Sequence, residues 1–214
     1  MSVHAAMGMD VSAIVLAGGR SSRFGRDKLA EPIAGVPLLH LAMTAVAGVC
    51  QEIVVVRRPL EAAGQLPGEA PRPVDVPLPV GLEVACVVAT DPKPFGGPLV
   101  GLLAGARRAT HPDLLVVGGD MPDLVPAVLR LLLEGLAAGL AAATVLAPDR
   151  PLPMAVRRAA VLTHAPGLLA AGERSLRALI EHVDSTVIPE PAWRAVDPEA
   201  RSLHDIDRTT DLPG

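Results

Sequence analysis

The feature that most constrains the fold is a series of short, continuously apolar segments separated by stretches long enough to form helices. Continuous rather than alternating apolarity is typical of strands that are covered on both faces. The expected strands are residues 12–16, 52–56, 83–89, 113–117 and 141–146, and the helices expected between them are residues 37–49, 98–109 and 122–135. This alternation predicts an α/β fold: a Rossmann-like, doubly wound and mostly parallel sheet with helices on both faces.

After residue 146 the regular alternation ends. The expected elements there are a strand at 151–157, helices at 158–171 and 175–182, and a strand at 186–188. Pro166-Gly167 should break the first of these helices, and the whole region should pack on the edge of the sheet and close one side of the site. Proline-rich residues 59–79 predict an irregular surface connection. The length of 214 residues favours one domain over residues 11–214, preceded by a flexible tail at 1–10.

The composition argues against nucleic-acid binding. Aromatic residues make up only 1% of the chain, so the stacking platforms that bind single-stranded nucleic acid are missing. The net charge is −4 and the basic residues are scattered except in one loop, which leaves no surface for DNA or RNA. We therefore expect no nucleic-acid partner, whereas a small anionic ligand is compatible with the sequence.

The most apolar stretch, residues 124–147, has the length of a membrane span, but a proline and two charged residues interrupt it. A buried helix running into a buried strand is favoured over a transmembrane helix. The N-terminus lacks the basic and apolar regions of a secretory signal, and Cys50 and Cys86 lack the spacing of a metal or redox site. We expect buried free thiols, a cytoplasmic location and no membrane partner.

A loop rich in glycine and cations follows the first expected strand. Its glycines are Gly18, Gly19 and Gly25, and its cations are Arg20, Arg23, Arg26 and Lys28. Glycines let a backbone approach a ligand with several N–H groups, and the cations add positive charge at the same place. The spacing fits neither a Walker A loop nor the dinucleotide fingerprint. Solvated arginines on an ordinary turn are the alternative, but the carboxyl end of a buried strand favours a polyphosphate site.

A carboxylate follows another expected strand. Asp120 comes directly after Gly118-Gly119 and two residues before Pro122. At such a position an aspartate can hold Mg²⁺, which in turn bridges phosphate oxygens. The alternative is that Asp120 caps a helix beginning near Pro122, and the two roles exclude one another.

Two further segments complete the candidate site. Residues 91–102 form a glycine-rich turn into a helix, and near the C-terminus Asp205 and Asp207 alternate before a short helix. Each segment also has an ordinary explanation, as a proline-initiated helix and as a capping loop. His204 lies in the second segment and is expected to be a bystander, and no nucleophilic triad or zinc site is indicated.

Together these segments resemble the MobA-like nucleotidyltransferase family, typified by molybdenum cofactor guanylyltransferase. Residues 16–28 fill every position of the family's opening pattern, Leu-Ala-Gly-Gly-x-Ser-x-Arg-Met/Phe-Gly-x-Asp-Lys. Residues 97–101 match its Gly-Pro-Leu-x-Gly segment and residues 120–122 its Asp-x-Pro turn, whereas residues 205–212 match its closing Asn-x-Asn-Thr-Pro-x-Asp-Leu only loosely. The resemblance spans residues 11–213 and implies the fold of the nucleotide-diphospho-sugar transferases.

The resemblance also implies roles for individual residues. Leu16, Ala17, Gly18, Gly19, Asp91 and Gly97 would bind the nucleotide, Arg23 and Lys28 would neutralise its phosphates, and Asp120 would bind Mg²⁺. Asp207 is added as a second metal ligand, because a carboxylate suits a hard cation better than the amide found in the family pattern.

The implied reaction is the attack of the molybdopterin phosphate on the α-phosphate of GTP, with release of pyrophosphate. Leu-Ala-Gly-Gly resembles the guanylyl branch, since related cytidylyltransferases usually have Leu-Ala-Ala-Gly. Arg57 follows the second strand where the family often has Asn, and Asp205 opens the altered closing motif. The alternatives are a transferase that uses CTP or another phosphorylated acceptor, and a non-catalytic nucleotide-binding module that serves a molybdoenzyme as its partner or chaperone.

Overall fold

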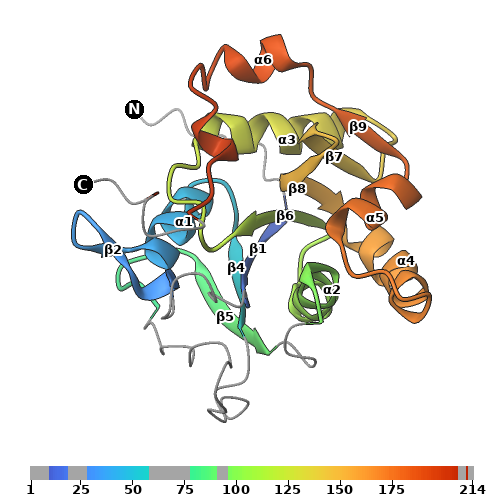
Figure 1. Ribbon diagram of the computed structural model, residues 1–214, viewed down its shortest axis with the longest axis horizontal. Helices are drawn as coiled ribbons and strands as arrows, with labels where there is room; N and C mark the ends of the chain where they lie inside the picture. Colours follow the sequence, from blue (N-terminus) through green and yellow to red (C-terminus); the bar gives the residue numbers. More distant parts are fainter. Residues whose placement is uncertain (1–9, 19–27, 58–77, 91–95, 207–210, 212–214) are drawn as a thin grey trace.

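The fold is built on one large sheet, seen in a computed structural model that describes residues 10–18, 28–57, 78–90, 96–206 and 211 (Figure 1). Its strands are β1 (Val11–Ala17), β4 (Glu52–Arg57), β5 (Ala85–Thr90), β6 (Asp113–Gly118), β7 (Ala143–Ala147), β8 (Arg150–Arg157) and β9 (Ser185–Val187). They lie in the order β5-β4-β1-β6-β8-β7-β9, and β8 alone among them runs antiparallel to its neighbours. The predicted doubly wound, mostly parallel sheet is confirmed.

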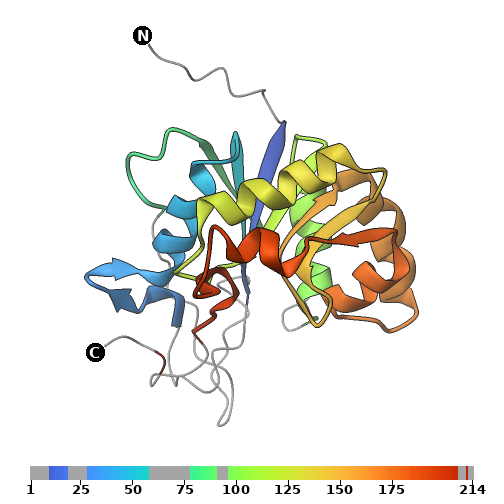
Figure 2. The same cartoon turned by 90° about the horizontal axis from the view of Figure 1, so that it is seen from above.

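Helices cover both faces of this sheet (Figures 1 and 2). One face carries α1 (Leu38–Ala47), α3 (Pro126–Ala138) and α6 (Glu190–Arg194), and the other carries α2 (Pro98–Arg108), α4 (Arg158–Ala170) and α5 (Leu176–His182). Glycine allows α2 to approach the sheet closely, because a Cβ atom on Gly105 would lie 2.8 Å from the Ile14 side chain.

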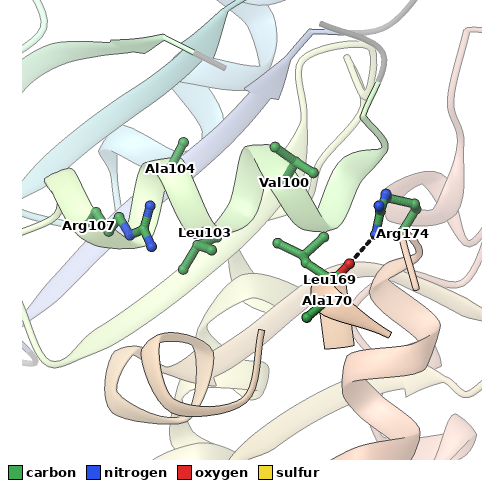
Figure 3. A pocket seen from close by; sticks show the side chains of 7 residues that line it. All are labelled: Val100, Leu103, Ala104, Arg107, Leu169, Ala170 and Arg174. Atoms are coloured by element: carbon green, nitrogen blue, oxygen red, sulfur yellow. Dashed lines mark hydrogen bonds between the residues drawn. The ribbon is translucent and has the colours of Figure 1, made fainter. Parts of the chain in front are cut away.

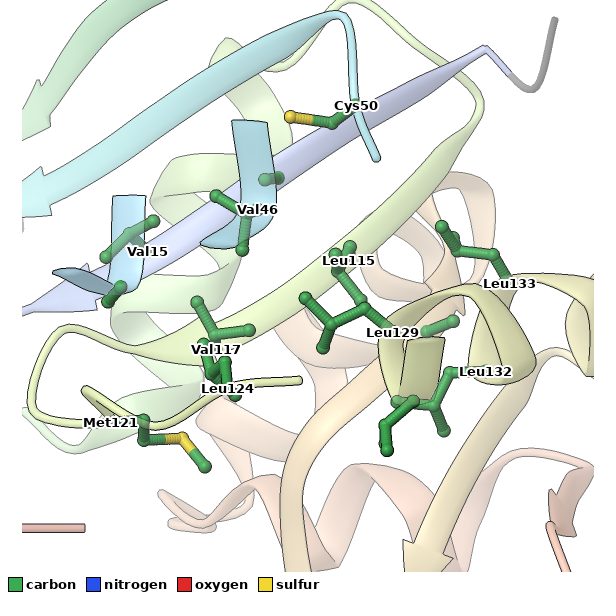
Figure 4. Close-up of a cluster of buried hydrophobic side chains, with 14 of the residues drawn as sticks. Val15, Val46, Cys50, Leu115, Val117, Met121, Leu124, Leu129, Leu132 and Leu133 are labelled. Atoms are coloured by element: carbon green, nitrogen blue, oxygen red, sulfur yellow. The ribbon is translucent and has the colours of Figure 1, made fainter. Parts of the chain in front are cut away.

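The apolar runs form strands because each supplies side chains to both layers at once. In β1, Ala13 and Val15 belong to the core beneath α1 and α3, in which Figure 4 shows Val15, whereas Ile14 belongs to the core beneath α2. Cys50 lies in the first of these cores and Cys86 is half-buried, and both are free thiols. Burial raises the pKa of the Cys50 thiol to about 12, so this group stays protonated and unreactive at neutral pH.

The apolar stretch 124–147 folds as predicted, with α3 followed by β7. Across the part of the chain that the structure describes, none of the helices has both the length and the apolarity needed to cross a membrane.

Three predictions about the elements were wrong. The helix expected from residue 122 begins at Pro126, because Val125 stays extended and the loop before it is held by other segments. The expected break at Pro166-Gly167 is absent from α4, since Val161 and Ala165 before the proline and Leu168 and Leu169 after it all pack on the same core. Packing therefore offsets the hydrogen bond that proline removes.

The third correction concerns the region after residue 146, which was expected on the edge of the sheet. Instead β8 enters the sheet between β6 and β7, where Met154 and Val156 are fully buried. Their partners in the register are Val116 and Leu114, and these continuous apolar runs allow an antiparallel strand to fill the interior of the sheet.

The hairpin of β2 (Pro32–Ile33) and β3 (Val36–Pro37) and the helix α6 were not predicted. The turn of the hairpin places Ala34 at φ 49° and Gly35 at φ 82°, conformations that glycine adopts more readily than alanine. The predicted tail lies outside the described residues except for Asp10, and so do residues 58–77 of the proline-rich connection. The assignment of residues 11–214 to one domain stays a prediction.

Candidate functional site

The candidate site forms where two parallel strands end side by side. β1 and β6 are neighbours, and Leu16 pairs with Gly118 at their carboxyl ends. The N–H group of Gly119 donates to the Leu16 carbonyl oxygen over 3.0 Å, which joins the loop after β6 to the end of β1. The start of the glycine-rich loop and the turn that carries Asp120 are therefore held together by the sheet itself.

Glycines allow the Asp120 side chain to fold back over the end of β6. A Cβ atom on Gly118 would collide with Oδ1 of Asp120, and one on Gly119 would lie 3.3 Å from Cδ1 of Leu39 and 3.4 Å from the Leu16 carbonyl oxygen. Asp120 does not cap α3, because the helix begins six residues later and Val125, at its N-cap, makes no side-chain capping bond. The capping alternative is therefore wrong, and the carboxylate is not committed to the N-terminus of α3.

Lys28 and Asp120 form an ion pair at this edge. The Lys28 ammonium donates to Oδ2 of Asp120 over 2.6 Å and to the carbonyl oxygen of Ile206 over 2.9 Å. Their side chains are 11% and 25% exposed, so the pair is largely screened from water but reachable. Ile206 also donates its N–H to the Asp120 carbonyl oxygen over 3.0 Å. Three segments far apart in sequence thus meet around one carboxylate.

The structure brings together only part of the predicted site. Leu16, Ala17 and Gly18 lie half-buried at the end of β1. The hydrogen bond from Gly119 to Leu16 connects this segment to the turn that carries Asp120. Gly97 precedes α2 with φ 95°, and Gly101 in the first turn of that helix packs towards the Leu16 side chain. The predicted residues Gly19, Arg23, Asp91 and Asp207 lie outside the described residues.

Two contributors were missed by sequence reasoning. Ile206 lies between the singled-out aspartates but acts through its backbone N–H and carbonyl groups, and no side-chain pattern reports on that. Arg174 packs against Gly97, where a Cβ atom would lie 2.7 Å from the Arg174 carbonyl oxygen, and the same oxygen accepts from the N–H group of Leu99.

Arg57 also lies at this edge. It ends β4 and pairs with Ala17 in the register of the two parallel strands. Its side chain is half-buried. A cation therefore stands beside the start of the glycine-rich loop, at the position where the family often has an asparagine.

Mg²⁺ is the metal that the resemblance implies, and the donor set is compatible with it. Within the described ranges no cluster of three or more His, Cys, Asp or Glu side chains is poised to hold an ion. Mg²⁺ does not require one, since proteins usually hold it with one or two carboxylates while water and substrate phosphates complete the shell. Asp120 supplies one such carboxylate, partly exposed and free of any capping role.

A pocket of about 350 Å³ lies elsewhere, between α2 and the end of α4 (Figure 3). Its lining is Val100, Leu103, Ala104, Arg107, Leu169, Ala170 and Arg174. None of the predicted site residues lines it. The Arg174 guanidinium donates to the carbonyl oxygens of Leu169 and Glu173, so its hydrogen bonds serve the α4–α5 connection.

Comparison with known proteins agrees with this geometry. The family model described as the MobA-like NTP transferase domain matches residues 13–187. A relative from Chloroflexus aggregans, named probable molybdenum cofactor guanylyltransferase, is 32% identical over 220 residues, covering 99% of this chain and 94% of its own.

Two solved structures share the fold. Molybdopterin-guanine dinucleotide biosynthesis protein A from Archaeoglobus fulgidus superposes with a TM-score of 0.71 at 23% identity, over 94% of both chains. The 2-C-methyl-D-erythritol 4-phosphate cytidylyltransferase from Thermus thermophilus gives a TM-score of 0.64 at 16% identity, over 95% of this chain and 96% of the other. With its opening motif, its sheet and the family match over most of its length, the chain belongs to the MobA-like NTP transferase family.

Proposed function

We propose that this chain transfers GMP from GTP to the phosphate of molybdenum-molybdopterin, releasing pyrophosphate, and that the reaction depends on Mg²⁺. The observation that carries the proposal is the convergence of Lys28 and Asp120 at the carboxyl ends of β1 and β6. A cation and a carboxylate on glycine-lined turns are the groups that polyphosphate chemistry needs. The name of the relative from Chloroflexus aggregans supports the same donor and acceptor.

The proposed reaction is a displacement at phosphorus. An oxygen of the acceptor phosphate forms a bond to the α-phosphorus of GTP, and the bond from that phosphorus to the pyrophosphate oxygen breaks. No covalent enzyme intermediate is needed, so the protein has to align the reactants and neutralise charge. Bound through Asp120, and through Asp207 as a second ligand, Mg²⁺ would supply charge neutralisation at the phosphate oxygens.

Different residues of the chain would neutralise charge and hold the substrates. Lys28 would exchange its bond to Asp120 for one to a phosphate oxygen, while the Ile206 carbonyl continues to hold its ammonium group. The end of β1, residues 16–18, together with Gly19 and Arg23, would bind the triphosphate. Asp91 and Gly97 would contact the nucleoside side.

Pyrophosphate release tests the proposal directly. The purified protein is incubated with Mg²⁺, molybdenum-loaded molybdopterin and each nucleoside triphosphate in turn, with EDTA and acceptor-free reactions as controls. We expect release with GTP that requires both Mg²⁺ and the acceptor. Release of pyrophosphate with CTP but not with GTP would overturn the guanylyl assignment. If none of the nucleotides gives release, the binding module is favoured.

A transferase with another base or acceptor is the second candidate. Arg57 supports it, because this cation stands beside Ala17 where the family often has an asparagine. Repeating the assay with CTP and with other phosphorylated acceptors separates the two candidates.

For the leading candidate, the product would pass to molybdoenzymes or their chaperones in the cytoplasm, where GTP is available.

A further inference from the structure

The loop that carries Asp120 has no regular structure and is held by a distant part of the chain. It runs from Asp120 to Val125, between β6 and α3. Residues 197–206, here called the C-terminal strap, include the short 3-10 helix Arg201–Leu203 and lie beside the first turn of α3 (Figures 1 and 2). The strap contacts the loop at its beginning, middle and end.

These three contacts differ in character. At the beginning, the Ile206 N–H donates to the Asp120 carbonyl oxygen over 3.0 Å. In the middle, Arg201 and Asp123 approach to 3.6 Å with side chains 55% and 42% exposed. At the end, the N–H group of Val125 donates to the Ser202 hydroxyl over 3.0 Å. Exposed ion pairs of such length contribute little, so the two hydrogen bonds hold the loop.

The Ser202 hydroxyl supplies a hydrogen-bond acceptor for the N-terminus of α3, which has none from neighbouring side chains. The first N–H groups of a helix have no partner within the helix, and α3 has no side-chain cap of its own. Ser202 is fully buried and supplies the acceptor for Val125 from 77 positions away. The hydroxyl therefore fixes the point where the Asp120 loop ends and α3 begins.

The strap is itself rigidly organised. Asp197, only 2% exposed, accepts the N–H groups of Arg201 over 2.9 Å and Ser202 over 2.8 Å. It follows α6, whose Trp193 is buried in the core with α3. The guanidinium group of Arg150 on β8 donates to the carbonyl oxygen of Leu203 over 3.1 Å. A strap anchored in this way can hold Ser202 and Ile206 at fixed positions.

We propose that Ser202 is a positioning residue for Asp120, acting from outside the site. Ser202 ties the end of the loop while Ile206 ties its beginning, and together they set the Asp120 carboxylate against Lys28. The proposal rests on the proposed function in one respect, namely that Asp120 holds the metal for the transfer.

The test compares Ser202→Ala with Val161→Ala, which leaves a small cavity in the opposite core and touches no part of the loop. Both variants are assayed well below their unfolding temperatures, and Mn²⁺ affinity with GTP present is measured alongside kcat and the KM for GTP. For Ser202→Ala we expect about tenfold weaker Mn²⁺ binding and a similar loss in kcat, because small misplacements of reacting groups are costly, with little change in KM. Val161→Ala should match the wild type in all three.

A second readout separates the possible failures. Hydrogen exchange of the amides at 120–125 should be faster in Ser202→Ala than in Val161→Ala. Equal Mn²⁺ affinities in the two variants would overturn the positioning role even if Ser202→Ala is less stable. If the wild type transfers no nucleotide, the proposed function fails, and Mn²⁺ affinity still decides the role of Ser202. Should Ser202→Ala not fold, Ser202→Cys, with its weaker acceptor, is expected to shift Mn²⁺ affinity in the same direction by less.

Discussion

The two ends of β1 carry polar clusters of opposite character. At the amino end, the fully buried Ser12 hydroxyl donates to Oε2 of Glu52 over 2.5 Å and accepts the N–H group of His111 over 3.2 Å. The same Glu52 oxygen accepts from the N–H group of Thr110 over 2.9 Å. This network closes on itself and joins β1, β4 and the segment that leads into β6.

At the carboxyl end, the Lys28–Asp120 pair is partly open to solvent. Asp120 is 25% exposed, glycines line the turn beneath it, and the pair is completed by a backbone carbonyl from the C-terminal strap. A closed, buried network stabilises the fold, whereas a reachable pair of charges can exchange partners with a ligand. The two ends of one strand therefore differ in whether a ligand can reach the polar groups.

Asp120→Ala should have the largest effect on activity. Removing the carboxylate removes the group expected to hold Mg²⁺, and loss of even an outer partner of a metal site costs about 10- to 100-fold, so turnover should fall by more than about 100-fold. Pyrophosphate release gives the rate, and circular dichroism should report an unchanged fold. Turnover near the wild-type rate would remove Asp120 as the metal ligand.

Lys28→Met should separate the binding of phosphate by Lys28 from the binding of metal by Asp120. Without the ammonium group we expect GTP affinity to fall by about tenfold or more, because one charge-assisted contact to phosphate is lost. Mn²⁺ binding in the absence of nucleotide should become tighter, since Asp120 no longer has Lys28 as its counter-ion. Calorimetric titrations with GTP and with Mn²⁺ measure both quantities. Weaker Mn²⁺ binding would contradict the exchange of partners.

Glu52→Gln should lower stability and leave activity alone. Loss of the charge-assisted bonds to Ser12 and Thr110 should reduce the free energy of unfolding by about 1–2 kcal/mol, measured by urea denaturation. With kcat and KM unchanged, the amino-end network is purely structural. A change in kcat comparable to that of Lys28→Met would erase the distinction between the two ends.

The pH dependence of stability sharpens the same comparison. Burial raises the pKa of Glu52, but the hydrogen bonds from Ser12 and Thr110 outweigh burial and leave it below the ordinary value of 4.5. A carboxyl group with a depressed folded-state pKa contributes stability that is present above its unfolded pKa and is lost as pH falls through the folded value. The stability difference between wild type and Glu52→Gln should therefore shrink in unfolding titrations below about pH 4.5.

The smallest effect is expected for Gly18→Ala. The resemblance associates a second alanine in the opening motif with cytidylyl transfer, and a single methyl group in a binding site changes discrimination by about tenfold or somewhat more. The ratio of kcat/KM for GTP to that for CTP should fall by up to that factor. An unchanged ratio would mean that base choice lies in another segment.

Much of the fold could be predicted because its cause is local. Residues 12–16, 52–56 and 113–117 are continuously apolar, and each became a central strand within one or two residues of the predicted bounds. Because β1 and β6 are parallel neighbours, the turns that follow them bring Gly18 and Asp120 to the same edge of the sheet. The start of α3 was wrong because Pro122 and Pro126 both suit a first helical turn, and the acceptor that distinguishes them, Ser202, is remote in sequence.

The sequence by itself determined the doubly wound sheet, the family and the presence of a cation-rich loop and a carboxylate after two of the strands, because these depend on residue type and on the period of apolar residues. Only the tertiary structure decided that β8 inserts antiparallel beside β6, that Asp120 caps no helix and that Ile206 holds Lys28 through its backbone. Backbone N–H and carbonyl groups are the same in every residue except proline, which lacks the N–H. Their contribution to a site is therefore invisible until the chain has brought them into place.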